Sequence, residues 1–159
     1  MTKRIPLTRG KFALVSDEDF NTLSQYRWYC SAKNYAVRSV ARNTGPLFMH
    51  RVIMDAPDGL EVDHINGDKL DNRRDNLRHA TSSQNKANVG PFSGKYKGVD
   101  RKGRKWRAQI RVNGKKTHLG LYSHAIQAAM AYDSIAFAQW GEFAYLNFPH
   151  LLDRGNGDD

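Results

Sequence analysis

The sequence predicts an α+β protein made of two small domains. Its 159 residues, 40% of them apolar, can bury two small cores as readily as one. A run of Gly, Pro and Ser between Asn88 and Gly94 breaks both helical and strand patterns, as a linker does. We therefore expect a first domain over residues 1–88, a linker over 89–95, a second domain over 96–150 and a disordered tail over 151–159.

The first domain begins with strands and a helix in alternation. Lys11–Val15 and Tyr35–Arg42 have the patterns of strands. Ser16 and the acidic residues after it indicate a helix start between them, because carboxylates suit the positive end of a helix. Phe48–Met54 is expected to form a short helix.

The rest of this domain predicts the order strand, polar loop, strand, helix. Val62–Ile65 and Leu77–Ala80 are the short strands, and Asn66-Gly67 is a good turn pair after the first of them. A capping box of Thr and Gln predicts a helix that begins at Thr81. Asn85 would then lie in the first turns of that helix.

The second domain predicts a three-stranded antiparallel sheet with one helix laid across it. Trp106–Val112 alternates strictly between apolar and polar residues, and Asn113-Gly114 is a strong hairpin signal. The hairpin leads into a strand over Lys115–Leu121 and then a helix over His124–Trp140, capped by Ser123. Three aromatic residues of this helix are expected in the core: Tyr132, Phe137 and Trp140.

The chain is strongly basic, with a net charge of +9 and a pI near 9.8. Residues 1–92 carry 14 Lys and Arg against 10 Asp and Glu, whereas residues 93–150 carry 10 against 3. Such a clustered surplus suits a surface that faces phosphate groups, although many basic proteins bind no polyanion specifically.

The single cysteine, Cys30, excludes a disulfide framework and a Cys-rich zinc site, and it fits a reducing compartment. The chain has neither an apolar run long enough to span a membrane nor an apolar signal segment after Met1. We expect a soluble protein in the cytoplasm of a bacterial cell or a phage-infected host, without membrane contact.

Asp63, His64 and the later Asn85 combine the groups that a metal-dependent phosphodiesterase needs. Carboxylate and amide oxygens suit a magnesium-like ion, and a neutral imidazole can take a proton from water. The Asp63-His64 pair alone is more typical of a surface turn residue beside a half-buried histidine. Because adjacent strand residues point to opposite faces, the strand must also twist or end there to serve one site.

The longer pattern favours the catalytic interpretation. Asp63–Gly67, followed by Asp71–Arg78 and a capped helix, resembles the HNH endonucleases, in particular the homing-endonuclease-like group of phages and bacteria. The resemblance covers residues 48–88 and implies a ββα-metal fold. It also implies a cleavage reaction that leaves 5′-phosphate and 3′-hydroxyl ends. It implies a divalent ion, with Mg²⁺ expected and Mn²⁺ or another ion as alternatives, and no structural zinc. It assigns Asp63 and Asn85 to metal binding and His64 and Asn76 to catalysis, as general base and loop brace.

Other polar residues near this pattern have plainer alternatives. His50 either packs in the core and braces the loop or contacts phosphate or metal, and Arg51 either contacts phosphate or is solvated. Asn72 is expected to form a turn rather than bind a ligand, and His79 to be structural.

Motifs of the second half, among them Tyr96–Val99, Trp106–Arg111 and Leu146–Pro149, resemble the apetala-two/ethylene-response-factor DNA-binding domain of plants. The resemblance covers residues 94–149 and implies a sheet that lies in the major groove of double-stranded DNA. Asp100 and His118 fall where the plant domains usually carry Arg and Trp, so the GC-rich target of those domains is not transferred. The residues expected to contact DNA are Lys97, Arg101, Arg107, Gln109, Arg111, Lys116 and His118.

The sequence thus predicts an HNH-type DNA endonuclease with no small-molecule substrate, and we expect it to nick a single strand as a monomer. The alternative is a sequence-specific DNA-binding regulator with a vestigial nuclease fold. An RNA nuclease is a weaker third hypothesis.

Overall fold

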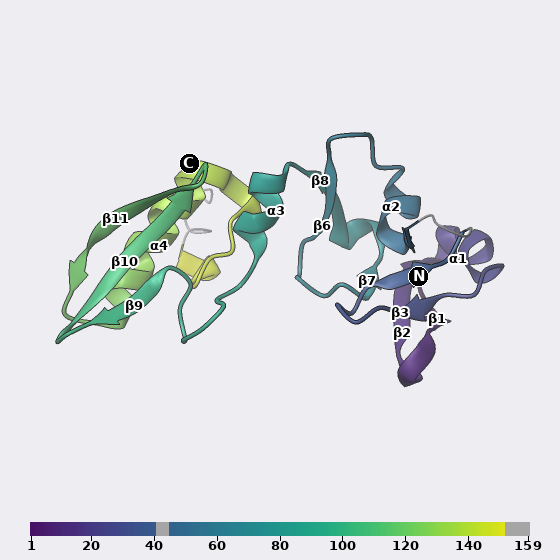
Figure 1. Cartoon of the computed structure of the whole chain (residues 1–159), viewed down its shortest axis with the longest axis horizontal. Coiled ribbons are helices and arrows are strands. Elements are labelled where there is room, and N and C mark those ends of the chain that lie inside the picture. Colours follow the sequence, from purple (N-terminus) through teal and green to yellow (C-terminus); the bar gives the residue numbers. More distant parts are fainter. Residues whose placement is uncertain (41–44, 152–159) are drawn as a thin grey trace, which may run out of the picture. The chain divides into compact units, whose positions relative to one another are not determined.

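The computed structural model describes residues 1–40 and 45–151, which form two compact units (Figure 1). The first unit is Met1–Ser82 and the second begins at Ser83. Helices and small sheets occur in both, so the predicted α+β class is confirmed. Most of the predicted tail, residues 152–159, and residues 41–42 of the predicted strand Tyr35–Arg42 lie outside the described residues.

The N-terminal part of the first unit is a β-hairpin followed by a helix. Strand β1 (Thr2–Pro6) pairs antiparallel with β2 (Phe12–Ser16), and a 3-10 turn over Thr8–Gly10 joins them. Helix α1 (Asp17–Ser24) begins directly after Ser16, with three acidic residues in its first turn as expected. The hairpin buries apolar residues in the core of the unit, among them Ile5, Ala13 and Val15.

A second small sheet and a short helix follow. Strands β3 (Tyr29–Cys30), β4 (Ala36–Arg38) and β5 (Leu47–Phe48) pair antiparallel in that order. Helix α2 (Met49–Met54) ends at Asp55, which has a left-handed backbone conformation. Met49 and Ile53 form the buried face of α2 and pack in the core.

The remaining elements of the first unit form a β-hairpin with a long polar connection. Strand β6 (Glu61–His64) pairs antiparallel with β8 (Leu77–Ala80). Between them lie β7 (Asp71–Asn72), which pairs parallel with β2, and a 3-10 turn over Arg74–Asn76. The connection between β6 and β8 therefore adds a third strand, β7, to the sheet of the N-terminal hairpin.

Helix α3 (Ser82–Asn88) begins within one residue of the predicted start. By its contacts it belongs to the second compact unit, whereas the sequence pattern places it before the linker. The two units therefore divide at Ser82/Ser83, before the Gly-Pro-Ser stretch.

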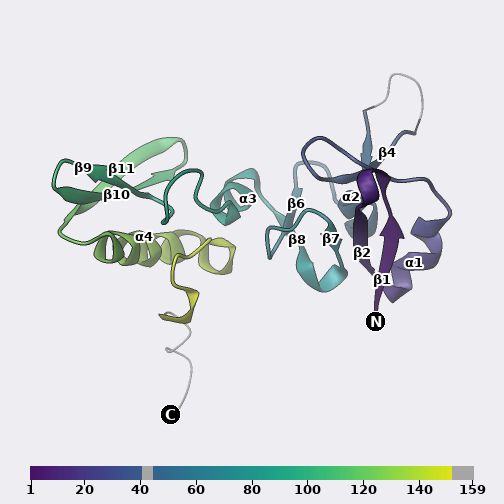
Figure 2. The same cartoon turned by 90° about the horizontal axis from the view of Figure 1, so that it is seen from below.

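The second unit is a three-stranded sheet covered on one face by a helix (Figure 2). Strands β9 (Val99–Lys102), β10 (Lys105–Val112) and β11 (Lys115–Tyr122) are antiparallel, with β10 in the centre. Helix α4 (Ala125–Trp140) is capped by His124 rather than Ser123, and the His124 amide donates to Gln127 Oε1 at 3.3 Å. Two 3-10 turns follow, Gly141–Phe143 and Pro149–Leu151.

The core of the second unit lies between β10 and α4. Ile110 of the sheet packs with Tyr132 and Ala136 of the helix, and Trp140 is partly buried against them. Phe137 is 46% exposed, so its expected place in the core is wrong. Its position on α4 lies beyond the edge of the helix face that carries Tyr132 and Ala136.

A buried carboxylate ties the chain after α4 to the start of the sheet. Asp133, which is buried, accepts hydrogen bonds from the amides of Asn147 and Phe148 and from Asn147 Nδ2. Asn147 Oδ1 accepts from the Lys97 amide at 2.7 Å. These bonds give Asn147, which lies in the Leu146–Pro149 motif, a structural role. Within the described residues, no helix is long and apolar enough to cross a membrane.

Gly98→Ala should strongly destabilise the second unit. A Cβ at Gly98 would lie 1.9 Å from Tyr132 Cδ2, at a φ of +75°. We expect overpacking of roughly 1–3 kcal/mol in addition to a backbone cost of about 1–2 kcal/mol. Gly114→Ala is the matched control, because Gly114 has a φ of +77° and nothing within 4 Å of the added atom. Urea denaturation that gives the two variants equal stability would contradict the close packing of Gly98.

Candidate active site

The β6–β8 hairpin holds Asp63 through a buried ion pair. Asp63 lies directly opposite Arg78 and is 3% exposed. Arg78 Nε and Nη2 contact Asp63 Oδ2 at 2.9 and 2.8 Å. A buried carboxylate needs such a partner, because an unpaired charge away from water costs about 3–5 kcal/mol. Arg78, to which the sequence assigns no role, therefore fixes the carboxylate of the candidate metal ligand.

His64 has a different partner from the one that holds its neighbour. Its Nε2 lies 3.2 Å from Asn72 Oδ1, and both side chains are buried. An amide oxygen accepts hydrogen bonds, so this contact favours the tautomer with hydrogen on Nε2 and the basic lone pair on Nδ1. Asn72 thus orients the candidate general base, a role that its turn-like sequence context does not reveal.

The imidazole of His64 is neutral near pH 7. Burial lowers the pKa of His64 below its ordinary value of 6.5, although the hydrogen bond to Asn72 and the charge of Asp63 act in the opposite direction. A neutral, oriented imidazole can accept a proton from water.

An aromatic cluster packs against His64. The rings of His50 and His64 meet edge to face with centroids 5.0 Å apart, and Tyr35 and Phe48 contact His50 at 5.4 Å. Burial lowers the pKa of His50 to about 3, so this imidazole is neutral too. His50 therefore packs against His64, in the manner of the bracing alternative. Arg51 donates to Leu60 O at 3.2 Å and holds the segment after α2.

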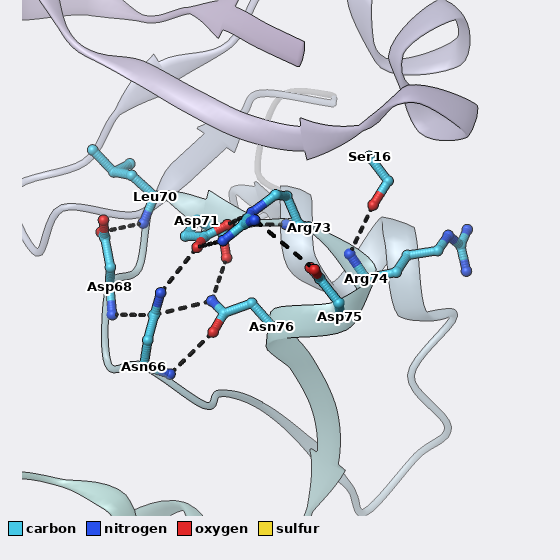
Figure 3. A network of polar contacts seen from close by, with 9 residues as sticks. All are labelled: Ser16, Asn66, Asp68, Leu70, Asp71, Arg73, Arg74, Asp75 and Asn76. Carbon is cyan, nitrogen blue, oxygen red and sulfur yellow. Dashed lines mark hydrogen bonds and ion pairs between the residues drawn. The ribbon is translucent and has the colours of Figure 1, made fainter. Parts of the chain in front are cut away.

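The connection over residues 65–76 is shaped by Asn76 (Figure 3). Asn76 Nδ2 donates to Asp71 O at 2.8 Å and to Asn66 Oδ1 at 3.0 Å, while its Oδ1 accepts from the Asn66 amide at 3.0 Å. Asp71 also accepts from Asn66 Nδ2 and forms an ion pair with Arg73. Asn76 thus joins the two ends of the connection, and this contact holds β7 and Asn72 beside His64.

The N-terminal hairpin and helix hold the same connection from outside. The Arg74 amide donates to Ser16 Oγ at 3.0 Å, as Figure 3 shows. Arg74 also pairs with Asp19 through Nε at 2.9 Å and Nη2 at 2.7 Å, and with Glu18 at 3.1 Å. Residues before the HNH-like pattern therefore position the segment that orients His64.

Asn85, the second expected metal ligand, lies on α3 in the other compact unit. The last turn of α3 is held there by Ala87 O, which accepts from the Tyr145 amide at 3.0 Å and from Lys97 Nζ at 2.5 Å. Burial lowers the pKa of Lys97 to about 8. Lys97, expected to contact DNA, thus binds the end of α3.

The other predicted DNA contacts divide between the two faces of the second sheet. Arg101 pairs across the strands with Trp106, on the face shared with Ala108 and Ile110 that α4 covers. The opposite face carries five of the predicted residues: Arg107, Gln109, Arg111, Lys116 and His118. By the same alternation, Lys102 and Lys105 lie on this outer face, although the sequence interpretation does not include them.

The donors in the first unit suit a hard divalent ion. Among the described residues, no group of three or more His, Cys, Asp and Glu is placed to hold a metal. Mg²⁺ commonly uses one or two protein oxygen ligands and completes its shell with water and substrate phosphate. The buried carboxylate of Asp63 fits such a site.

Comparison with known proteins agrees with this geometry. A family model described as HNH endonuclease matches residues 48–87. An uncharacterised HNH endonuclease of Acanthamoeba polyphaga mimivirus is 34% identical over 146 residues, which are 87% of this chain and 76% of that relative. The chain belongs to the HNH endonuclease family.

This HNH endonuclease also has partial plant relatives. Dehydration-responsive element-binding protein 2C of Arabidopsis thaliana is 40% identical over 76 residues, 45% of this chain and 22% of that protein. An ethylene-responsive transcription factor of the same plant is 48% identical over 60 residues, 36% of this chain and 33% of that protein. No solved structure matches the chain.

Changes at Asn72 should move the pKa of His64 in opposite directions. Asn72→Asp places a carboxylate beside the ring and raises the pKa, whereas Asn72→Ala removes a hydrogen bond that raises it and therefore lowers the pKa further. Imidazole NMR titration of the metal-free protein measures both shifts, with the exposed Asn21→Asp as a charge control. If both Asn72 variants titrate like the wild type, Asn72 does not hold His64.

Proposed function

We propose that this HNH endonuclease hydrolyses phosphodiester bonds of double-stranded DNA with a divalent ion, His64 acting as general base. The main support is the buried, neutral imidazole of His64, held through Nε2 by Asn72. Its lone pair on Nδ1 can take the proton of the attacking water. Asn76 maintains the connection that places Asn72, so its contribution to catalysis is indirect.

Asp63 and Asn85 are the residues proposed to hold the ion, with Mg²⁺ expected and Mn²⁺ as an alternative. Such an ion neutralises charge on the scissile phosphate and on the 3′-oxygen leaving group. Arg78 holds the Asp63 side chain in place through its ion pair.

The second half is proposed to bind the duplex through the outer face of its sheet. The support is the concentration of Lys and Arg in residues 93–150 and the alternation that places five predicted contacts on one face. The names of the partial plant relatives, an element-binding protein and a transcription factor, agree with this role. Neutralised phosphates would supply affinity, and base contacts would supply site choice. We further propose a monomer that nicks one strand.

His64→Ala should reduce metal-dependent cleavage of plasmid DNA by about 10²–10⁴-fold, because the proton of the attacking water loses its acceptor. The exposed His150→Ala is the matched control and should cut normally.

Asp63→Asn, which keeps the size of the side chain beside Arg78, should also abolish turnover. EDTA should stop cleavage by the wild type. Tight DNA binding without cutting, unchanged in His64→Ala, would instead favour a regulator with a vestigial nuclease fold, and preferential cutting of RNA would favour an RNA nuclease.

Arg111→Ala should weaken or relax site choice while cleavage of nonspecific DNA at high protein concentration persists. Arg111 is exposed on the outer face of the sheet, away from the candidate active-site residues in the sequence. Mapped cut positions on a mixed DNA library measure the effect. Arg4→Ala, an exposed change of the same charge on β1, should leave the cut pattern unaltered. Equal loss of nonspecific cleavage in Arg111→Ala would mean that reading and cutting are not separable.

A further inference from the structure

The outer face of the second sheet contains an acidic group that a DNA-binding surface should avoid. Asp100 is the only Asp or Glu between Val99 and Tyr122, a segment with eight Lys and Arg. A carboxylate on a surface that approaches phosphates weakens binding by repulsion. Asp100 therefore calls for a physical explanation.

Asp100 lies directly opposite Arg107 in the β9–β10 pair. Arg107 Nε donates to Oδ1 at 2.9 Å and Nη2 donates to Oδ2 at 2.5 Å, so the contact is a two-point pair along one side of the guanidinium. The Asp100 and Arg107 side chains are 42% and 30% exposed. Exposed ion pairs contribute little to folding stability, so stability does not account for Asp100.

The pair leaves a defined set of donors on Arg107. A guanidinium carries five N–H groups, and Asp100 uses one on Nε and one on Nη2. Both N–H groups of Nη1 and the second of Nη2 remain, along the outer end of the fork. Two parallel donors of this kind match O6 and N7 of guanine in the major groove.

We propose that Asp100 positions Arg107 to read one guanine of the DNA target, and that Asp100 is thereby a specificity-determining residue. The proposal rests on the proposed binding of DNA by this face. By holding the side chain of Arg107 in one orientation before binding, Asp100 reduces the conformational entropy lost on recognition. Arg111 differs, because its Nη1 donates to a backbone oxygen, that of Gly114.

A role for Arg107 in phosphate binding alone predicts the opposite effect of Asp100. Loss of the carboxylate would then remove a repulsive charge and raise affinity for all sequences, without changing base preference. Loss of a positioning contact would instead reduce preference at a single base pair. The two roles can therefore be distinguished by the preferred sequence and not only by affinity.

The experiment selects bound duplexes from a randomised library with the full-length protein in EDTA at fixed salt, and then measures Kd for single-base variants. Wild type should prefer guanine at one position by roughly ten-fold or more. Asp100→Ala should reduce this preference to about three-fold or less, with other positions unchanged, and Arg107→Ala should remove the same preference. The double variant should match Arg107→Ala, because Asp100 acts through that residue.

Asp58→Asn is the charge control, because Asp58 is exposed in the first unit and the change in net charge is the same. It should leave base preference unaltered. Uniformly tighter binding by Asp100→Ala with the wild-type motif intact would overturn the proposal, as would a change of preference by Asp100→Ala in the Arg107→Ala background. A wild type that enriches no motif would overturn base reading by this face altogether. A wild type that enriches a motif, with the same base preference in Asp100→Ala, would overturn only the positioning role of Asp100.

Discussion

The polar connection between β6 and β8 depends on the hydrogen bonds of one buried side chain, Asn76. It joins Asn66 to Asp71 at the two ends of a segment that has little apolar surface to bury. Buried polar networks hold a single shape when every member is paired, and they fail together when one is lost. β7 then pairs with β2, which brings Asn72 to His64. The proposed base is thus held by a chain of contacts that begins in the N-terminal hairpin.

Asp63 and His64 are adjacent in β6 yet have different electrostatic environments. The guanidinium of Arg78 pairs with the Asp63 side chain, while burial keeps His64 neutral. A hard metal ion takes oxygen ligands and a general base must be an uncharged imidazole, so the two environments suit the two proposed roles. The strand ends at His64, where the turn over residues 65–67 begins. Different partners on β7 and β8 therefore set the chemistry of two neighbouring residues.

Much of this architecture could be predicted from local patterns. The alternation of β10, the Asn113-Gly114 turn and the sequence pattern that predicts α3 each depend on neighbours in sequence. The strand, the turn and the helix all form as expected. The roles of Asn72, Arg78 and Lys97 could not be predicted, because each depends on a partner set by strand register or tertiary packing. β7 has two residues and no periodicity, and the contact of Ser16 with Arg74 joins residues 58 positions apart. The prediction that Phe137 lies in the core was wrong, because helical spacing alone does not define the edge of a packed face.

The contacts of helix α3 determine where a chain of this architecture can be cut and joined to a different second half. A junction in the Gly-Pro-Ser stretch after Asn88 would separate Ala87 O from Lys97 and Tyr145, and the last turn of α3 would lose both partners. A junction just before Ser82 keeps these bonds intact. The segment that recombination or protein engineering can transfer intact therefore begins with α3. A substituted second half would arrive with its own copy of Asn85, the residue proposed to bind the metal.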